Sequence, residues 1–295
     1  MNTDAKPAAR PPGRPAGAWH RLTGCIRLDE VSVLQGAPLL GACFTMPDFT
    51  AHSLLAIVAL IAANACLVAH IFVLNDWAGI EGDARDPNRA ARTFASRGVR
   101  RIDMVYLGTG LLVLALLLFS SVNATVVWIA IAIAALSALY SAPGFNGKAT
   151  PIVSSVLHLT GGTLHFLLGS AAFAALSWHG VAVACYFGMV FAAGHLTQEA
   201  RDHDSDRANG IRTNAVAFGR RQVMVWSLVL FTIAYVLLTS LAWCGAIPGL
   251  LALAIVLYPL QFVASLKTLR SHLDYPSVCR LQRRYRQIHA VIGLV

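Results

Sequence analysis

Long apolar segments separated by short polar segments occupy most of this chain. An α-helix needs about 20 residues to cross the hydrocarbon core of a membrane, and most of the segments approach this length. They lie at residues 31–46, 54–74, 104–122, 126–139, 153–176, 181–195, 223–243 and 247–266, and a ninth begins at Ile288, too near the end of the sequence to complete a crossing. The pattern predicts an all-α fold, a polytopic transmembrane bundle of eight to nine spans.

The composition agrees with a membrane protein. Hydrophobic residues make up 57% of the chain and charged residues only 13%, whereas soluble domains carry roughly 25% charged residues. The six cysteines form no Cys-x-x-Cys pair, so they indicate neither a zinc site nor a disulfide framework. Residues 1–19 are rich in Pro, Ala and Arg, and we expect a flexible cytoplasmic tail there, followed by a single transmembrane domain over residues 20–295.

The basic residues all lie on one side of the predicted topology. All 23 Lys and Arg residues fall before the first segment, in the loops after the second, fourth and sixth segments, or after the eighth. Such loops are cytoplasmic under the positive-inside rule, which also favours eight complete spans. We therefore expect an integral protein of a bacterial-type inner or cell membrane, with the N-terminus and the acidic loops in the cytoplasm. The same distribution explains the net charge of +9 without nucleic acid as a partner.

Two acidic clusters stand out against this basic background. The first, residues 75–86, follows the second apolar segment, and the other, residues 199–207, follows the sixth; together they hold eight of the 14 acids. Carboxylates close to hydrocarbon are energetically costly and tend to be functional. We interpret the clusters as two halves of one site for a polyphosphate and a divalent metal. The alternative is a pair of solvated loops whose acids and arginines pair with each other.

Helical spacing brings the acids of each cluster onto one face. If each cluster continues the preceding helix, Asp202 and Asp206 share a face and Asp204 points elsewhere. Asp76 and Asp83 are seven residues apart and share a face as well, with Asn75 beside them. Such a set of oxygen ligands suits Mg²⁺, which often joins carboxylates to substrate phosphates. The interleaved arginines favour a metal together with pyrophosphate over a metal alone: Arg85, Arg89, Arg207 and Arg212.

Two histidines lie inside the fifth apolar segment. His158 and His165 are seven residues apart and therefore share a helix face. We interpret them as hydrogen-bonded contacts between helices, the alternative being that they line a cavity and contact an acceptor. The neighbouring Gly161-Gly162 pair predicts close helix packing.

At the residues of the two acidic clusters, the chain resembles the UbiA family of intramembrane prenyltransferases. The first family motif, Asn-Asp-x-x-Asp-x-x-x-Asp, is matched by Asn75, Asp76 and Asp83, with Gly79 in place of the middle Asp. An Asn-Arg-Pro-like turn often follows that motif, and Pro87-Asn88-Arg89 follows here.

The second and third family motifs are also present in part. The second is matched by Asp202, Asp206, Arg207 and the segment 210–213, while Gly194 and Gln198 replace the family's Tyr and Lys. The third is Tyr-Ser-x-Pro followed by a basic residue, matched by residues 140–143 and Lys148. The span pattern fits the family over nearly the whole chain.

The resemblance implies a helical bundle around a central cavity, with transfer of a prenyl group from a prenyl pyrophosphate to an acceptor, usually aromatic. It does not identify a general base, so the catalytic base stays unknown. Among further residues, Asp86 is a candidate to replace the carboxylate missing at Gly79, and Tyr140 and Arg212 are auxiliary candidates. The implied Mg²⁺ ligands are Asn75, Asp76, Asp83, Asp202 and Asp206, and the implied pyrophosphate-binding residues are Arg89, Lys148 and Arg207.

Two other interpretations remain open. A relative with different chemistry is one: a membrane terpene cyclase, or a transferase to a non-aromatic acceptor. A transporter or channel with acidic cytoplasmic gates is the other. The second is disfavoured because the apolar segments carry no acid near their middle, where transporters usually need one.

Overall fold

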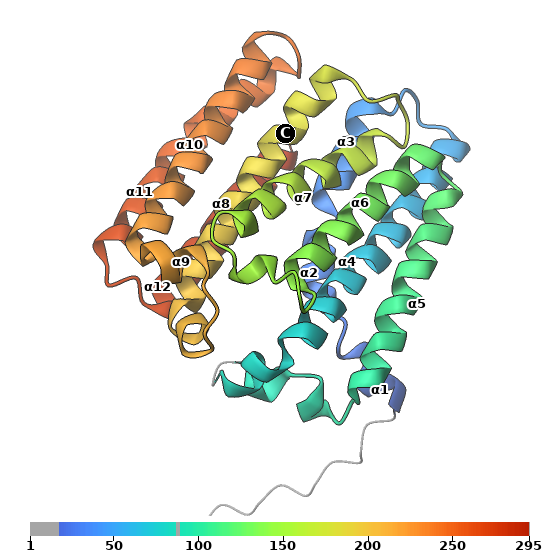
Figure 1. Cartoon of the computed structure of the whole chain (residues 1–295). Helices are drawn as coiled ribbons and strands as arrows, with labels where there is room; N and C mark the ends of the chain where they lie inside the picture. The colour runs from blue at the N-terminus through green and yellow to red at the C-terminus, as the bar shows by residue number, and fades with distance from the viewer. Residues whose placement is uncertain (1–17, 87–88, 295) are drawn as a thin grey trace, which may run out of the picture.

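The computed structural model describes residues 18–86 and 89–294, and every regular element in these ranges is a helix (Figure 1). Most of the tail predicted for residues 1–19 lies outside the described residues, as do Pro87 and Asn88. The α-helices are α1 Ala18–Thr23, α2 Leu28–Val33, α3 Gly36–Thr45, α4 Ala51–Arg85, α5 Arg101–Ser120, α6 Ala124–Ser141, α7 Val153–Ser170, α8 Trp178–Ala208, α9 Asn214–Phe218, α10 Arg220–Trp243, α11 Tyr258–Arg270 and α12 Tyr275–Leu294. The 3₁₀ helices are η1 Ala90–Arg92, η2 Ala95–Arg97, η3 Gly147–Ala149 and η4 Gly249–Leu257.

The predicted transmembrane bundle is confirmed. Six helices of the described ranges are long and apolar enough to cross a membrane: α4, α5, α6, α8, α10 and the continuous segment Gly249–Arg270, which joins η4 to α11. They correspond to six of the eight predicted spans. The other two predicted spans do not meet both requirements. Residues 31–46 form two short helices, and α7, with 18 residues like α6, is less apolar, so the predicted count of eight to nine is approximate.

The first predicted span, residues 31–46, is not one helix. Helix α2 ends at Val33, and α3 begins at Gly36. Pro38 lies in the first turn of α3, where a missing N–H leaves no hydrogen bond unmade. At 1.5 Å per residue, the 10 residues of α3 reach only about half-way across a bilayer.

The end of the chain also differs from the prediction. The last helix, α12, begins at Tyr275 rather than at Ile288. Four arginines lie within its residues 280–286, so the sequence shows no long apolar segment there. It packs along α8 and α11 and buries apolar side chains such as Val278 and Leu281.

Glycines let α3, α7 and α8 pack at very short distances. A Cβ atom on Gly41 or Gly169 would collide with backbone atoms of the facing helix across the α3–α7 contact. A Cβ on Gly162 would lie 2.6 Å from the Cβ of Phe191 on α8, so the close packing predicted for the glycine pair is present at Gly162. Gly161 instead has open space beside it and faces the central cavity.

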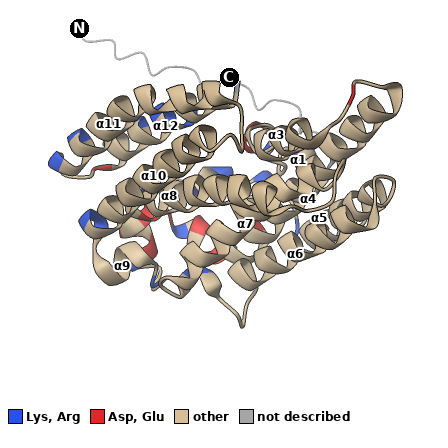
Figure 2. Cartoon of the chain, turned by 90° about the horizontal axis from the view of Figure 1, so that it is seen from above, with Lys and Arg blue, Asp and Glu red and all other residues tan. Residues whose placement is uncertain are grey.

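Both acidic clusters are helical, and both lie at the same end of the bundle. Helix α4 continues past the apolar segment to Arg85, and α8 continues to Ala208. The loops that follow them lie together at the lower end of Figure 1. In Figure 2, acidic and basic positions lie side by side near α7 and α8, while the ribbons of α5 and α6 are largely uncharged. The fold thus brings segments more than 100 residues apart in sequence to one cavity.

Candidate active site

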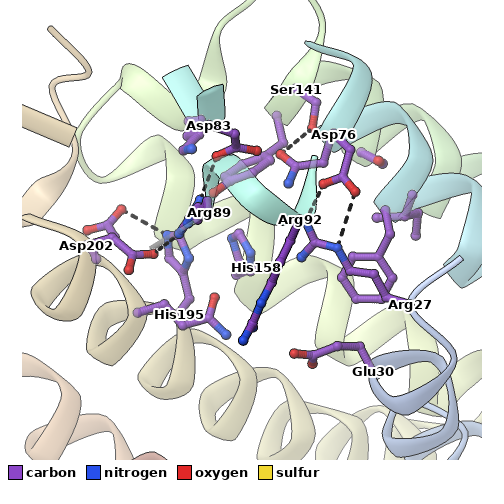
Figure 3. A pocket seen from close by; sticks show the side chains of 18 of the residues that line it. Arg27, Glu30, Asp76, Asp83, Arg89, Arg92, Ser141, His158, His195 and Asp202 are labelled. Atoms are coloured by element: carbon purple, nitrogen blue, oxygen red, sulfur yellow. Dashed lines mark hydrogen bonds and ion pairs between the residues drawn. The ribbon is translucent and has the colours of Figure 1, made fainter. Parts of the chain in front are cut away.

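A cavity of about 620 Å³ lies between α4, α6, α7 and α8, and residues of α2, the loop after α4 and α12 also line it. Its volume falls in the usual range of small-molecule sites, about 300–1,000 Å³. Part of its wall is apolar and is formed by Ile71, Phe72, Ile133, Leu136, Leu157 and Phe191. The rest is polar and contains both acidic clusters (Figure 3).

The first cluster faces the cavity from the end of α4. Asn75, Asp76 and Asp83 all line it, as the helical spacing predicts. The Asp76 carboxylate forms an ion pair with Arg27, whose Nε atom lies 3.3 Å from Oδ2. Asn75 Oδ1 accepts a hydrogen bond from Ser141 Oγ at 3.5 Å, which connects α4 to α6.

The second cluster faces the cavity from α8. Arg201 binds Asp202 with two hydrogen bonds of 2.7 and 2.8 Å. Asp206 is 6% exposed, and the described residues offer its carboxylate no hydrogen bond or ion pair. Asp204 points away, as predicted: its side chain is 82% exposed, and it pairs with Arg220 and His203.

Arg89 connects the two clusters. Its Nη1 atom donates to Asp83 Oδ1 at 3.0 Å, and its Nη2 atom donates to Asp202 Oδ2 (Figure 3). Burial by itself lowers the pKa of Arg89, but the carboxylates of Asp202 and Asp83 outweigh this effect and raise it. The guanidinium is therefore charged at every physiological pH and holds two acid-bearing helices together.

The remaining predicted residues divide into two groups. Lys148 and Tyr140 line the cavity. Arg207 and Arg212 are exposed and do not line it, and the pyrophosphate-binding role of Arg207 stays a prediction. Asp86 is buried, does not line the cavity and has its Oδ2 atom 3.5 Å from Arg89 Nε, and its part in replacing the carboxylate missing at Gly79 stays a prediction.

Several cavity residues were missed in the sequence. Arg27, Arg92 and Arg201 line the cavity but entered the sequence argument only as cytoplasmic charges. His195 and Glu199 also line it, and their spacing of four residues on one helix was a signal that we did not use. The histidines of α7 were interpreted as interhelical contacts; instead each bonds a carbonyl of its own helix, and both line the cavity.

Comparison with known proteins identifies the family. The family model described as the UbiA prenyltransferase family matches residues 37–277, most of the chain. This protein belongs to the UbiA prenyltransferase family. It is an integral membrane protein of that family, whose members are prenyltransferases. No curated protein sequence matches the chain significantly.

Solved UbiA homologues have the same fold at low sequence identity. One from Archaeoglobus fulgidus, bound to GPP and Mg²⁺, is 15% identical with a TM-score of 0.70, over 93% of this chain and 100% of its own. One from Aeropyrum pernix K1, without ligand, is 17% identical with a TM-score of 0.72, over 91% and 97%. A digeranylgeranylglyceryl phosphate synthase is 16% identical with a TM-score of 0.70, over 94% and 96%.

Proposed function

We propose that this UbiA-family protein transfers a prenyl group from a prenyl pyrophosphate to an aromatic acceptor, with Mg²⁺ as cofactor and release of pyrophosphate. The main support is the meeting of the two acidic clusters across one cavity, joined by Arg89. Quinone precursors are one class of acceptor that suits such a reaction. The solved homologue bound to GPP and Mg²⁺ supports the choice of donor and metal.

The side chains fit a divalent cation that arrives with an anion. Within the described ranges, no three His, Cys, Asp or Glu residues are grouped so that they could hold a metal by themselves. Most of the carboxylates already have a cationic partner, but Asp206 is nearly buried with none in contact. A buried carboxylate of this kind is stable only when neutralised by protonation, an ion pair or a metal. We propose that Asn75, Asp76, Asp83, Asp202 and Asp206 hold Mg²⁺.

Bound Mg²⁺ would neutralise charge that develops on the pyrophosphate as the allylic C–O bond breaks. The cationic side chains add to this effect. Arg89 and Lys148 line the cavity beside the acids, and preorganised cations at a developing negative charge lower the barrier to reaction. The apolar wall would hold the isoprenoid chain and keep water from the allylic cation. We further propose that the acidic ends of α4 and α8 face the cytoplasm of a bacterial-type cell, because the basic residues gather on that side.

The direct test is pyrophosphate release by the purified protein. Geranyl, farnesyl and geranylgeranyl pyrophosphate would be supplied with Mg²⁺, with and without hydroxylated aromatic acids. We expect release that depends on an acceptor, and a loss of about 100-fold or more in Asp206→Asn. Asp204→Asn is the matched control, because this neighbour on α8 is exposed and points away, so its activity should stay within twofold of wild type.

Other outcomes would decide against the proposal. Release without any acceptor would favour a terpene cyclase of the same family. Equal activity of wild type and Asp206→Asn would remove this acid from the metal site. No release from any donor would reject prenyl transfer altogether.

A further inference from the structure

Two histidines lie stacked in the cavity and have no role in the metal and pyrophosphate chemistry proposed above. His158 on α7 and His195 on α8 face each other with ring centroids 3.6 Å apart and an angle of only 8° between the ring planes (Figure 3). The Tyr140 ring meets His158 edge-on, with centroids 4.8 Å apart. All three side chains line the cavity that holds the acidic clusters.

The contacts of His158 fix which of its nitrogens is basic. Its Nδ1 atom lies 2.8 Å from the carbonyl oxygen of Ser154. A carbonyl oxygen only accepts hydrogen bonds, so Nδ1 carries the hydrogen and a neutral ring has its lone pair on Nε2. No described residue hydrogen-bonds to this Nε2 atom. His158 is partly exposed to the cavity, whereas His195 is only 4% exposed.

A buried carboxylate lies directly beside this pair. Glu199 is 4% exposed, and its Oε1 atom is 3.0 Å from His195 Nε2. The same oxygen accepts hydrogen bonds from Ser154 Oγ at 3.0 Å and Asn214 Nδ2 at 3.1 Å. These bonds hold Glu199 in place, and its negative charge stabilises one positive charge on the adjacent rings.

The histidine pair is therefore built to take up one proton. Two stacked rings that both carried a charge would repel each other strongly at this distance. A single charge shared near Glu199 is balanced by the carboxylate. Tyr140, His195 and Glu199 are the titratable groups that contact His158 or its stacked neighbour.

We propose that Nε2 of His158 accepts the proton of a hydroxyl group on the acceptor and so is the general base of the transfer. This inference rests on the proposed prenyl transfer. The hydroxyl proton moves to Nε2, and the electron pair of the O–H bond stays on oxygen. A ring carbon then bonds to C1 of the allylic group, while the electron pair of the C1–O bond leaves with pyrophosphate. The ring regains aromaticity when the hydrogen at the new bond moves to oxygen, and His158 later releases its proton to water.

His195 and Glu199 act as positioning residues in this scheme. They keep the His158 ring in place and stabilise its charged form. The neighbouring His165 offers a matched control on the same helix. Its Nδ1 atom also contacts a carbonyl one turn earlier, Gly161 O at 2.9 Å, but its Nε2 atom is buried without a partner.

The test compares His158→Gln and His165→Gln with a series of phenols of increasing acidity. A positioned general base typically contributes a factor of 10² to 10⁴, so we expect kcat of His158→Gln to fall about 100-fold or more with weakly acidic phenols. Phenols that are already ionised at the assay pH should restore most of the rate. The KM for the prenyl donor should change less than twofold, and any loss of rate in His165→Gln should be the same for every phenol, whatever its acidity.

Binding of an unreactive thiopyrophosphate analogue of the donor, with Mn²⁺, checks that each variant is folded. Glu199→Gln gives a second test, because it removes the charge but keeps a hydrogen-bond acceptor; we expect a smaller loss with the same dependence on phenol acidity. A rate of His158→Gln that equals wild type, or that is lowered equally for all phenols, overturns the inference. Transfer only to acceptors without a hydroxyl also overturns it but leaves prenyl transfer standing. A wild-type protein that transfers to no acceptor would instead reject the proposed function.

Discussion

Replacing Arg89 by Met should strengthen metal binding in the absence of substrate while weakening catalysis. In the wild-type protein the guanidinium binds Asp83 and Asp202, two of the proposed metal ligands. A divalent cation that binds without pyrophosphate must compete with this positive charge. Methionine has a similar length and no charge, so it frees Asp83 and leaves Asp202 paired with Arg201 but no longer with Arg89.

The size of the effect follows from the contacts that are lost. Hydrogen bonds between charged groups contribute about 1.5–3 kcal/mol each, and the lower end applies because the Arg89 side chain is 33% exposed. Two such bonds amount to about 3 kcal/mol, or about 100-fold in affinity. Relaxation of the freed carboxylates toward water reduces this value. We therefore expect Mn²⁺ affinity without donor to rise at least about 10-fold.

The assay is a titration of the detergent-purified protein with Mn²⁺, followed by electron paramagnetic resonance. Arg89→Lys keeps the charge but not the two-pronged geometry, and its affinity should stay within about threefold of wild type. Adding Asp202→Asn to Arg89→Met should abolish the gain. Turnover with Mg²⁺ and donor should fall about 10-fold or more, because a cation facing the leaving group is lost. Unchanged or weaker Mn²⁺ binding in Arg89→Met would show that arginine and metal do not compete for these carboxylates.

The remaining predictions concern substitutions of Gly79 and Gly162. A Cβ atom at Gly79 would meet only Asp83 Oδ2, at 3.7 Å, so Gly79→Asp has room for the carboxylate of the family motif; we expect the Mg²⁺ concentration for half-maximal rate to fall several-fold, and no such fall in Gly79→Asn. Gly162→Ala forces α7 away from α8, where overpacking typically costs about 1–3 kcal/mol. We expect its melting temperature in detergent to drop by several degrees, and that of Gly161→Ala, which has open space, to stay unchanged.

The pattern of apolar segments predicts most of the bundle because a chain that crosses lipid can adopt few backbone structures. A backbone in hydrocarbon must satisfy its hydrogen bonds internally, so a long apolar segment is almost always a helix. This reasoning identified α4, α5, α6, α8 and α10. It failed at residues 31–46, where the apolar segment contains a helix break, and at α12, whose four arginines are exposed while its apolar side chains pack on α8.

The site was predictable only where residues of one helix determine it. Helical spacing correctly placed Asp202 and Asp206 on the cavity side and Asp204 outside. Contacts between distant segments could not be obtained in this way. The pairing of Arg27 with Asp76 joins residues 49 positions apart, and the stacking of His158 on His195 depends on how closely α7 approaches α8. A single sequence does not indicate which residues of distant segments contact each other.

The position of Gly194 illustrates how packing can explain a departure from the family pattern. The family motif has a Tyr at this position, on the face of α8 that meets α12. Here a Cβ atom on Gly194 would lie 2.9 Å from the hydroxyl oxygen of Tyr285, so the tyrosine of α12 fills the space that a side chain would need. Tyr285 is 6% exposed and packs against Phe231 with ring centroids 5.1 Å apart. The glycine therefore allows close contact between α8 and α12. Helix α12 in turn contacts the second acidic cluster, because its Gln282 side chain accepts a hydrogen bond from Arg201.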